Sequence, residues 1–296
     1  MKKTKIIFIG NVINSYILLK TLTKFSSKYE VFVITNKNKK KSDFFDLSQF
    51  CKEKKINFYL TKDCNDEITY NWIKKINPDY IFCFGWSQIL KKRIIKQAKK
   101  FCIGFHPAEL PYNRGKHPII WAIVLGLKKT ASTFFVMGDK VDNGQILSQK
   151  IIKITPSDNA TKLYKKISLT SSKQLHDLLK KLNKIKTKKV KFKSQISNLW
   201  RKRNFVDGVV DWRMNAKNIM NLVNALKSPY PYASFNYKKK FIKILNASII
   251  KNINKNDEYG KVIFIKNSNP VIKCGDFAIM LSKTKPKIKI KKGIYL

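Results

Sequence analysis

The sequence predicts an α/β fold in which a mostly parallel sheet has helices on both faces, followed by a small, mostly-β domain. Two observations predict it. In the first 100 residues, short apolar runs alternate with segments whose apolar residues recur at helical spacing, which is typical of a parallel sheet covered on both sides. After residue 235, only short strand-like runs remain. At 296 residues, the chain has room for one large and one small domain.

The first hundred residues supply the predicted parallel strands. Strands are expected at Lys5–Gly10, Val31–Thr35, Ile56–Leu60 and Tyr80–Gly85. Amphipathic helices are expected at Val12–Phe25, Asp43–Glu53, Asp66–Ile76 and Gln88–Lys99. The first strand-to-helix turn lacks the GxGxxG pattern, so a dinucleotide cofactor is not indicated. We therefore expect a Rossmann-like sheet whose ligands lie at the carboxyl ends of its strands.

The remaining residues complete this domain and add a second one. The first domain would end with a strand at Cys102–Phe105, a helix at Ile119–Leu127, a strand at Ala131–Met137 and a helix at 158–182. Between Leu178 and Val206 there is no acidic residue, which favours a solvated link. A helix at Asn215–Leu226 then precedes short strands at Phe241–Ile244, Lys261–Ile265, Val271–Lys273, Ala278–Leu281 and Lys287–Ile290. We expect a first domain over 1–195, a linker over 196–212 and a small barrel-like domain over 213–296.

Composition limits the partners and the compartment. The net charge is +44, but only five of the 62 basic residues are Arg, the residue that proteins usually recruit to bind phosphates. We interpret the Lys excess as a bias of base composition, so nucleic-acid binding is not favoured although the charge allows it. The five scattered Cys residues argue against disulfides and a zinc site. With no signal-peptide pattern and no apolar run near the ~20 residues that span a bilayer, we expect a soluble, cytoplasmic protein without a metal.

One 13-residue loop, residues 106–118, contains two of the three histidines. His106 directly follows an apolar strand, so its imidazole would lie at the carboxyl edge of the sheet and could polarise a carbonyl or move a proton. Asp142, in a later loop, would reach the same edge if the strand before it is parallel, and could orient the histidine or accept a proton. The alternatives are a histidine that caps loop backbone and an ordinary Asp-Asn-Gly turn.

Two loops and the distance between them resemble a known family. His106–Trp121 reads His-Pro-x-x-Leu-Pro-x-x-Arg-Gly-x-x-Pro-Ile-x-Trp, and Val141–Leu147 reads Val-Asp-Asn-Gly-Gln-Ile-Leu. This is similar to the N10-formyltetrahydrofolate-dependent formyltransferases, which include methionyl-tRNA formyltransferase and enzymes that N-formylate nucleotide-linked amino sugars. The resemblance implies a sheet domain that binds folate and transfers the formyl group, and a small C-terminal domain that is often barrel-like.

The resemblance also implies a catalytic trio: an Asn, a His two residues later, and an Asp in the second loop. His106 and Asp142 match, whereas the Asn position falls on Gly104. In the family that amide helps to bind the formyl oxygen as it becomes negative, and loss of one such donor typically costs about 100- to 1,000-fold in rate. Asn113 is a candidate replacement, with an ordinary turn residue as the alternative.

Binding residues follow from the same resemblance. N10-formyltetrahydrofolate, as co-substrate, is expected along the turn Gly85, Trp86, Ser87 and Gln88, with Asp139 also in contact. A buried core position is the alternative for Trp86. Arg114 and Lys116 are expected to neutralise a diphosphate, unless they only form a solvated face of the loop. No metal is implied.

The acceptor of the formyl group is expected to be the amine of a dTDP- or UDP-linked amino sugar, for surface polysaccharide such as lipopolysaccharide O-antigen. Lys116 and His117, which follow the Arg-Gly pair, and the sequences Gly85–Ser87 and Ser132–Phe135 resemble the sugar-directed group. The initiator methionyl-tRNA is the alternative acceptor. A third interpretation, a non-catalytic polyanion- or RNA-binding relative, is motivated by Gly104 and the +44 charge. A homodimer is common among similar sugar enzymes and is an expected option here.

Overall fold

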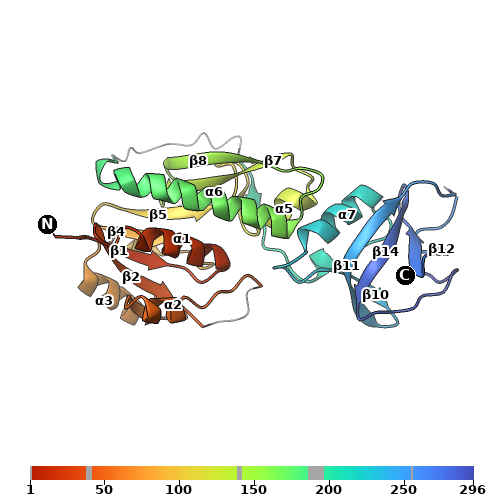
Figure 1. Cartoon of the computed structure of the whole chain (residues 1–296), viewed down its shortest axis with the longest axis horizontal. Coiled ribbons are helices and arrows are strands. Elements are labelled where there is room, and N and C mark those ends of the chain that lie inside the picture. The colour runs from red at the N-terminus through yellow and green to blue at the C-terminus, as the bar shows by residue number, and fades with distance from the viewer. Residues whose placement is uncertain (1, 38–41, 139–141, 186–196, 255) are drawn as a thin grey trace. The chain divides into compact units, whose positions relative to one another are not determined.

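The computed structural model describes the chain except residues 1, 38–41, 139–141, 186–196 and 255 (Figure 1). The chain forms two compact units. The first contains Met1–Pro118, Thr130–Lys153 and Lys165–Trp200, and the second contains Ile119–Lys129, Ile154–Tyr164 and Arg201–Leu296. Both units are therefore assembled from segments that are separated in the sequence.

A seven-stranded sheet of order β3-β2-β1-β4-β5-β7-β8 forms the centre of the first unit. Its strands are β1 (Thr4–Ile9), β2 (Tyr29–Thr35), β3 (Asn57–Leu60), β4 (Tyr80–Cys83), β5 (Phe101–His106), β7 (Lys129–Val136) and β8 (Ile146–Lys153). The pairs among β1 to β5 are parallel, whereas β7 runs antiparallel to β5. The mostly parallel sheet confirms the predicted fold class.

Helices cover both faces of this sheet (Figure 1). They are α1 (Ile13–Thr23), α2 (Leu47–Glu53), α3 (Glu67–Ile76), α4 (Lys92–Ile95) and α6 (Ala160–Lys181). In β1, Ile6 and Phe8 belong to one buried cluster with residues of α1, α2 and α6, whereas Ile7 and Ile9 belong to another with residues of α3 and α4. Because successive strand residues point to opposite faces, a strand between two helical layers is apolar throughout. This explains the continuous apolar runs in the sequence.

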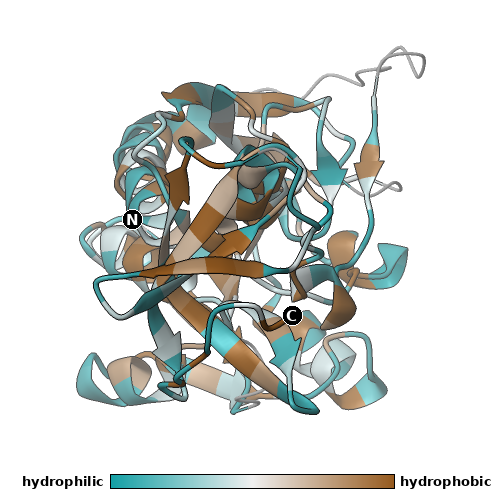
Figure 2. Ribbon diagram, turned by 90° about the vertical axis from the view of Figure 1, so that its right-hand side faces the viewer, coloured by the Kyte–Doolittle hydropathy of each residue, from teal (hydrophilic) through white to brown (hydrophobic). Residues whose placement is uncertain are grey.

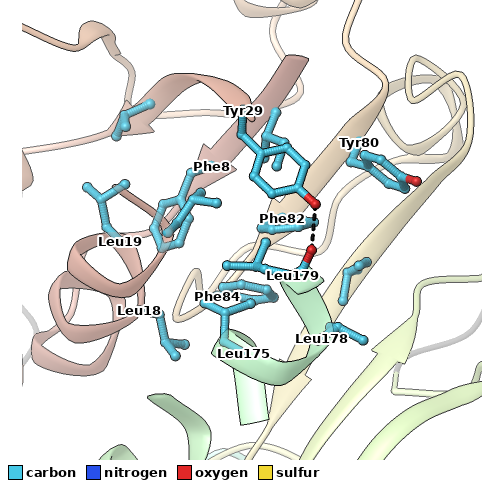
Figure 3. Close-up of a cluster of buried hydrophobic side chains, with 14 of the residues drawn as sticks. Phe8, Leu18, Leu19, Tyr29, Tyr80, Phe82, Phe84, Leu175, Leu178 and Leu179 are labelled. Carbon is cyan, nitrogen blue, oxygen red and sulfur yellow. Dashed lines mark hydrogen bonds between the residues drawn. The ribbon is translucent and has the colours of Figure 1, made fainter. Parts of the chain in front are cut away.

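A buried tyrosine fastens α6 to the sheet. The hydroxyl of Tyr29, at the start of β2, donates a hydrogen bond of 2.7 Å to the Leu179 carbonyl of α6 (Figure 3). Burial raises the pKa of Tyr29 to about 12, so the hydroxyl remains protonated and available as a donor. The bond satisfies a C-terminal carbonyl of the helix, one of the groups that has no partner within the helix itself.

The predicted helix at Gln88–Lys99 was wrong in extent, because only Lys92–Ile95 is α-helical. Side chains bind the backbone of the preceding residues instead. The Asn65 carboxamide accepts from the Lys91 N–H at 2.7 Å, and its Nδ2 donates to the Ile89 carbonyl at 3.1 Å. Such side-chain bonds compete with the helical ladder, so the chain after β4 forms an irregular turn.

The second unit contains a five-stranded antiparallel sheet of order β10-β11-β14-β13-β12, together with α7 (Ala216–Ala225). The strands are β10 (Ala233–Tyr237), β11 (Lys240–Ile250), β12 (Val262–Lys266), β13 (Asn269–Lys273) and β14 (Ala278–Lys285). Figure 2 shows hydrophobic residues along these strands and hydrophilic residues in the turns that join them. The small, mostly-β C-terminal domain is thereby confirmed.

Two details of the second unit correct the prediction. β10 was not predicted, and the expected strand at Lys287–Ile290 is absent although its residues alternate. β14 continues to Lys285, and Pro286 follows it. Proline has no N–H to donate to a ladder, so the sheet ends there in spite of the favourable pattern beyond it.

Candidate active site

His106 is the last residue of β5, and its side chain is buried. Its Nε2 lies 2.8 Å from the backbone oxygen of Asn113 in the following loop. Because a carbonyl oxygen can only accept, Nε2–H is the donor in this contact. The strand thus fixes the backbone of His106 and the loop fixes its ring, so the imidazole has a defined orientation.

Asp142 faces the other nitrogen of the ring. Its Oδ2 lies 3.5 Å from His106 Nδ1 and accepts a 3.0 Å hydrogen bond from the Gly115 N–H. The distance to Nδ1 is too long for a good hydrogen bond, but it places the carboxylate against the second nitrogen of the ring. The two residues that the sequence singled out for chemistry therefore lie side by side, one from each loop.

Asp142 reaches His106 by a different route from the one expected. The expectation required a parallel strand before Asp142, but β7 is antiparallel to β5, with Phe135 opposite Gly104. The Val136 N–H donates to the Gln145 carbonyl at 2.8 Å, which closes the connection between β7 and β8. Asp142 therefore lies in the connection between β7 and β8, which are neighbours in the sheet.

Side chains of β7 and β8 hold the backbone of the loop at residues 106–118. The Thr133 hydroxyl donates to the Ala108 carbonyl at 2.7 Å, and Gln149 Nε2 donates to the Leu110 carbonyl at 3.0 Å. Gln149 Nε2 also lies 3.1 Å from the Thr133 hydroxyl. Loop carbonyls that would otherwise lose hydration are therefore paired, and the loop is held to a rigid sheet.

Gly104 has no space for a side chain. A Cβ atom there would lie 2.6 Å from Cζ of Phe135 and 3.0 Å from Cγ of Met137. Phe135 is itself buried in the unit. A neighbouring aromatic ring therefore fills the space in which an asparagine side chain would begin, and no side-chain donor can be supplied from this position without repacking.

The turn after β4 brings together four of the residues predicted to bind folate. Gly85 has φ +79°, and a Cβ on it would lie 2.3 Å from Val12, so the turn requires glycine. Half-buried Trp86 donates its indole N–H to Gln88 Oε1 at 3.2 Å. Lys116 Nζ donates to the Ser87 carbonyl at 2.6 Å, which ties this turn to the loop that follows β5. Asp139, also predicted to bind folate, lies outside the described residues.

Arg114 has an unused donor. Its Nη2 donates to the Ser197 hydroxyl at 2.9 Å, whereas its Nε is buried and has no hydrogen-bond partner in the described part of the chain. A buried donor without an acceptor is costly. The guanidinium therefore suits a ligand that supplies an anionic oxygen.

Asn113 contributes to the site through its backbone. It has φ +59°, its carbonyl accepts from His106, and its side-chain oxygen accepts from Asn198 Nδ2 at 3.1 Å. Sequence reasoning missed Asn198, because it lies in the basic stretch that was interpreted as a solvated link. The apolar pair Leu199-Trp200 in that stretch was the available signal of a packed segment.

Other kinds of site find no support in the residues that the structure describes. Among them, no group of three or more His, Cys, Asp and Glu side chains could hold a metal ion. In the same residues, no helix has the length and apolar character needed to cross a bilayer.

Comparison with known proteins identifies both parts of the chain. Residues 4–179 match the family model described as formyl transferase, and residues 206–293 match the model described as formyl transferase, C-terminal domain. A bifunctional polymyxin resistance protein ArnA from Wigglesworthia glossinidia brevipalpis is 36% identical over 189 residues, which are 64% of this chain and 29% of that protein. The chain therefore spans less than a third of the length of this relative.

Two further similarities extend over more of the chain. A methionyl-tRNA formyltransferase from Caldanaerobacter subterraneus subsp. tengcongensis is 31% identical over 222 residues, 75% of this chain and 71% of that protein. The crystal structure of an N-formyltransferase from Helicobacter canadensis, in complex with folinic acid and dTDP-3-aminofucose, matches with a TM-score of 0.68 at 18% identity, covering 94% of this chain and 98% of that one. At this level of identity, the structural match establishes the fold.

Proposed function

The chain belongs to the formyl transferase family, and we propose that it transfers the formyl group of N10-formyltetrahydrofolate to the primary amine of a nucleotide-linked amino sugar. The observation that carries this proposal is the buried His106, whose two ring nitrogens lie 2.8 Å from the Asn113 carbonyl and 3.5 Å from Asp142. An imidazole with a fixed orientation and an adjacent carboxylate suits a reaction in which charge develops on a carbonyl oxygen and an amine loses a proton.

His106 and Asp142 would act on different parts of the reaction, one on the formyl oxygen and the other on the proton of the amine. N10-formyltetrahydrofolate supplies an activated formyl group. As the acceptor amine bonds to the formyl carbon and the bond from that carbon to N10 breaks, His106 Nε2–H exchanges its bond to Asn113 for one to the formyl oxygen. Asp142, on the Nδ1 side, holds the ring and receives the proton that the amine releases. N10 takes up that proton from Asp142 as it leaves, so the amine proton ends on tetrahydrofolate and Asp142 is ionised again.

The turn at residues 85–88 fits a flat heteroaromatic ring. Gly85 keeps the strand end free of a side chain, and half-buried Trp86 supplies an aromatic surface whose indole N–H is already paired with Gln88. Aromatic side chains of this kind bury large areas of a ligand ring. Lys116 links this turn to the loop that contacts His106, so a donor bound along the turn would lie near the imidazole.

Arg114 and Lys116 favour an acceptor with phosphate groups. The Nε of Arg114, which has no partner among the described residues, suits an anionic oxygen, and Lys116 adds a second positive charge from the same loop. Arg and Lys are the usual partners of phosphates in proteins. The Helicobacter canadensis enzyme of similar fold, solved with dTDP-3-aminofucose, supports a nucleotide-linked sugar.

Initiator methionyl-tRNA is the second candidate acceptor. The match to a methionyl-tRNA formyltransferase at 31% identity over 75% of this chain favours it, as does the net charge of +44, which would attract a polyanion. The two candidates share the proposed chemistry at His106 and differ only in the molecule that carries the amine.

The test follows release of tetrahydrofolate from N10-formyltetrahydrofolate with a panel of dTDP- and UDP-linked 3-amino and 4-amino sugars and with initiator methionyl-tRNA. Turnover with a sugar and not with the tRNA is expected. Turnover with the tRNA alone would overturn the sugar proposal. If no acceptor is used and nucleic acid binds with a steep salt dependence, the non-catalytic interpretation replaces both.

A further inference from the structure

A short segment of the basic stretch between Leu178 and Val206 lies against the loop that contains His106. We call residues Ser197–Trp200 the strap. Its part β9 (Leu199–Trp200) pairs in parallel with β6 (Arg114–Gly115). The N–H of Lys116 also donates to the Trp200 carbonyl at 3.0 Å. The strap thus adds a small ladder to a loop that has no other regular structure at this point.

Asn198 binds Asn113 through both ends of its carboxamide. Its Oδ1 accepts from the Asn113 N–H at 2.7 Å, and its Nδ2 donates to the Asn113 side-chain oxygen at 3.1 Å. Asn113 has φ +59°, a left-handed conformation that non-glycine residues seldom adopt. A paired side chain and a paired N–H hold the residue in this conformation, which is the one that directs its carbonyl to His106 Nε2.

The strap also approaches the residue that contacts Asp142. Gly115 has φ +103°, and a Cβ on it would lie 2.3 Å from the Trp200 carbonyl, so only glycine allows this approach. The Gly115 N–H donates to Asp142 Oδ2. The strap therefore contacts the two loop residues that bind, respectively, His106 and its carboxylate partner.

We propose that Asn198 is a positioning residue for His106, acting through Asn113, and that the strap is a built part of the active site. The proposal rests on the proposed function for its catalytic meaning, because His106 is the group that is positioned. Asn198 contacts neither the ring nor the reacting atoms, so its effect is on the orientation of the imidazole and on the site of its proton.

The first measurement needs no substrate. The chain has three histidines, so 15N-edited NMR of the imidazole nitrogens, assigned with His117→Gln and His176→Gln, reports the tautomer of neutral His106. In the wild-type protein we expect the hydrogen on Nε2, as the bond to Asn113 requires. In Asn198→Ala we expect a mixture of tautomers. Asn198→Asp keeps an acceptor for the Asn113 N–H and is expected to restore the wild-type pattern.

The second measurement is kinetic and uses the full chain with the acceptor that the panel of amino sugars and tRNA identifies. Asn198→Ala is expected to lower kcat by about 10- to 30-fold with less than a threefold change in KM for N10-formyltetrahydrofolate, and Asn198→Asp to recover most of the loss. Asn236→Ala, an exposed asparagine of β10, is the matched control and should behave as wild type.

Two outcomes would overturn the proposal. One is an unchanged His106 tautomer in Asn198→Ala. The other is a loss of rate explained by a fall in the folded fraction, seen by far-UV circular dichroism, with no change in the NMR signals. If the wild type transfers formyl to no acceptor but the tautomer still changes in Asn198→Ala, the proposed function fails and the positioning of His106 by Asn198 stands.

Discussion

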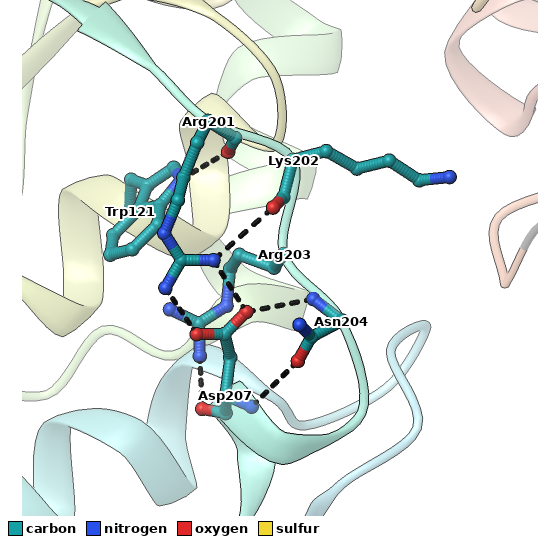
Figure 4. Close-up of polar contacts among 6 residues, drawn as sticks. All are labelled: Trp121, Arg201, Lys202, Arg203, Asn204 and Asp207. Carbon is teal, nitrogen blue, oxygen red and sulfur yellow. Dashed lines mark hydrogen bonds and ion pairs between the residues drawn. The ribbon is translucent and has the colours of Figure 1, made fainter.

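Two aspartates, one in each unit, differ in how many hydrogen-bond donors surround their carboxylates. Asp207, in the second unit, is surrounded by donors (Figure 4). Both terminal nitrogens of the Arg201 guanidinium and the Asn204 N–H donate to its carboxylate. The Arg203 guanidinium donates to the backbone carbonyl of Asp207, and the backbone N–H of Asp207 donates to the side-chain oxygen of Asn204. The hydrogen bonds from Arg201 are the main reason why the pKa of Asp207 lies well below the usual range of an aspartate.

Asp142, in the first unit, has fewer donors among the residues that the structure describes. One backbone N–H, that of Gly115, donates to its Oδ2, and the nearby imidazole is 3.5 Å away. The carboxylate therefore has acceptor capacity left for a proton or a substrate N–H. A carboxylate surrounded by donors holds local structure together, whereas one with acceptor capacity left beside a histidine can still bind a proton or a substrate N–H.

The largest effect on the rate of formyl transfer is expected from substitution of His106, the histidine beside Asp142. We expect His106→Ala to lower the rate of formyl transfer by about 1,000-fold, because general acid–base and hydrogen-bond catalysis contribute on the order of 100- to 10,000-fold. The measurement is the initial rate of tetrahydrofolate release. His176→Ala, at a partly exposed position on α6, should retain wild-type rate. A similar loss in both variants would contradict a special role for His106.

The same substitution in both aspartates tests the comparison directly. Asp142→Asn keeps an acceptor for the Gly115 N–H but removes the charge, so we expect formyl transfer to fall by about 100-fold. Asp207→Asn should leave the rate per folded molecule within about threefold of wild type. Equal losses in the two variants, at equal folded fraction, would show that the contrast between the sites is not functional.

A third prediction concerns the space beside Gly104. Gly104→Asn should lower the free energy of unfolding by about 1–3 kcal/mol in urea titrations, because the new side chain overlaps with the Phe135 ring. In a Phe135→Ala background, which lacks the ring, Gly104→Asn should cost less than it does in the wild-type chain. Gly293→Asn is the control, since no atom lies within 4 Å of a Cβ at that position and asparagine tolerates its positive φ. If Gly104→Asn is as stable as wild type, the site has more room than the packing indicates.

The smallest expected effect is on stability at the Asp207 site. Asp207→Asn should lower the unfolding midpoint by roughly 2–4 °C at neutral pH, as expected for a largely solvent-screened network in a chain of this size. Because the folded-state pKa of Asp207 lies below that of an unfolded aspartate, its contribution is present above about pH 4 and declines as the pH falls through the folded-state pKa. The difference between variant and wild type should therefore shrink on acidification. A difference that grows would contradict this assignment.

Local sequence patterns were sufficient to predict most of the fold. Continuous apolar runs predicted the parallel strands because each is buried on two faces, and the alternation of Ile6 to Ile9 between two helical layers shows this requirement. The helix expected at Asp66–Ile76 was predicted almost to the residue, and Asp66 caps α3 by accepting from the Thr69 N–H. The helix expected from Asp43 begins only at Leu47, where Asp46 is the capping residue. The prediction failed at Gln88–Lys99, where Asn65, distant in the sequence, binds the backbone.

By itself, the sequence determined the α/β class, the separate β domain and the two loops that contain His106 and Asp142, because periodicity and motif spacing are properties of neighbouring residues. Tertiary structure alone decided how the site is assembled. The antiparallel pairing of β7 with β5, the Phe135 ring beside Gly104 and the contact of Asn198 with Asn113 each join residues at least 27 positions apart. Such contacts depend on packing and on the pairing of buried polar groups, for which a single sequence contains no local signal.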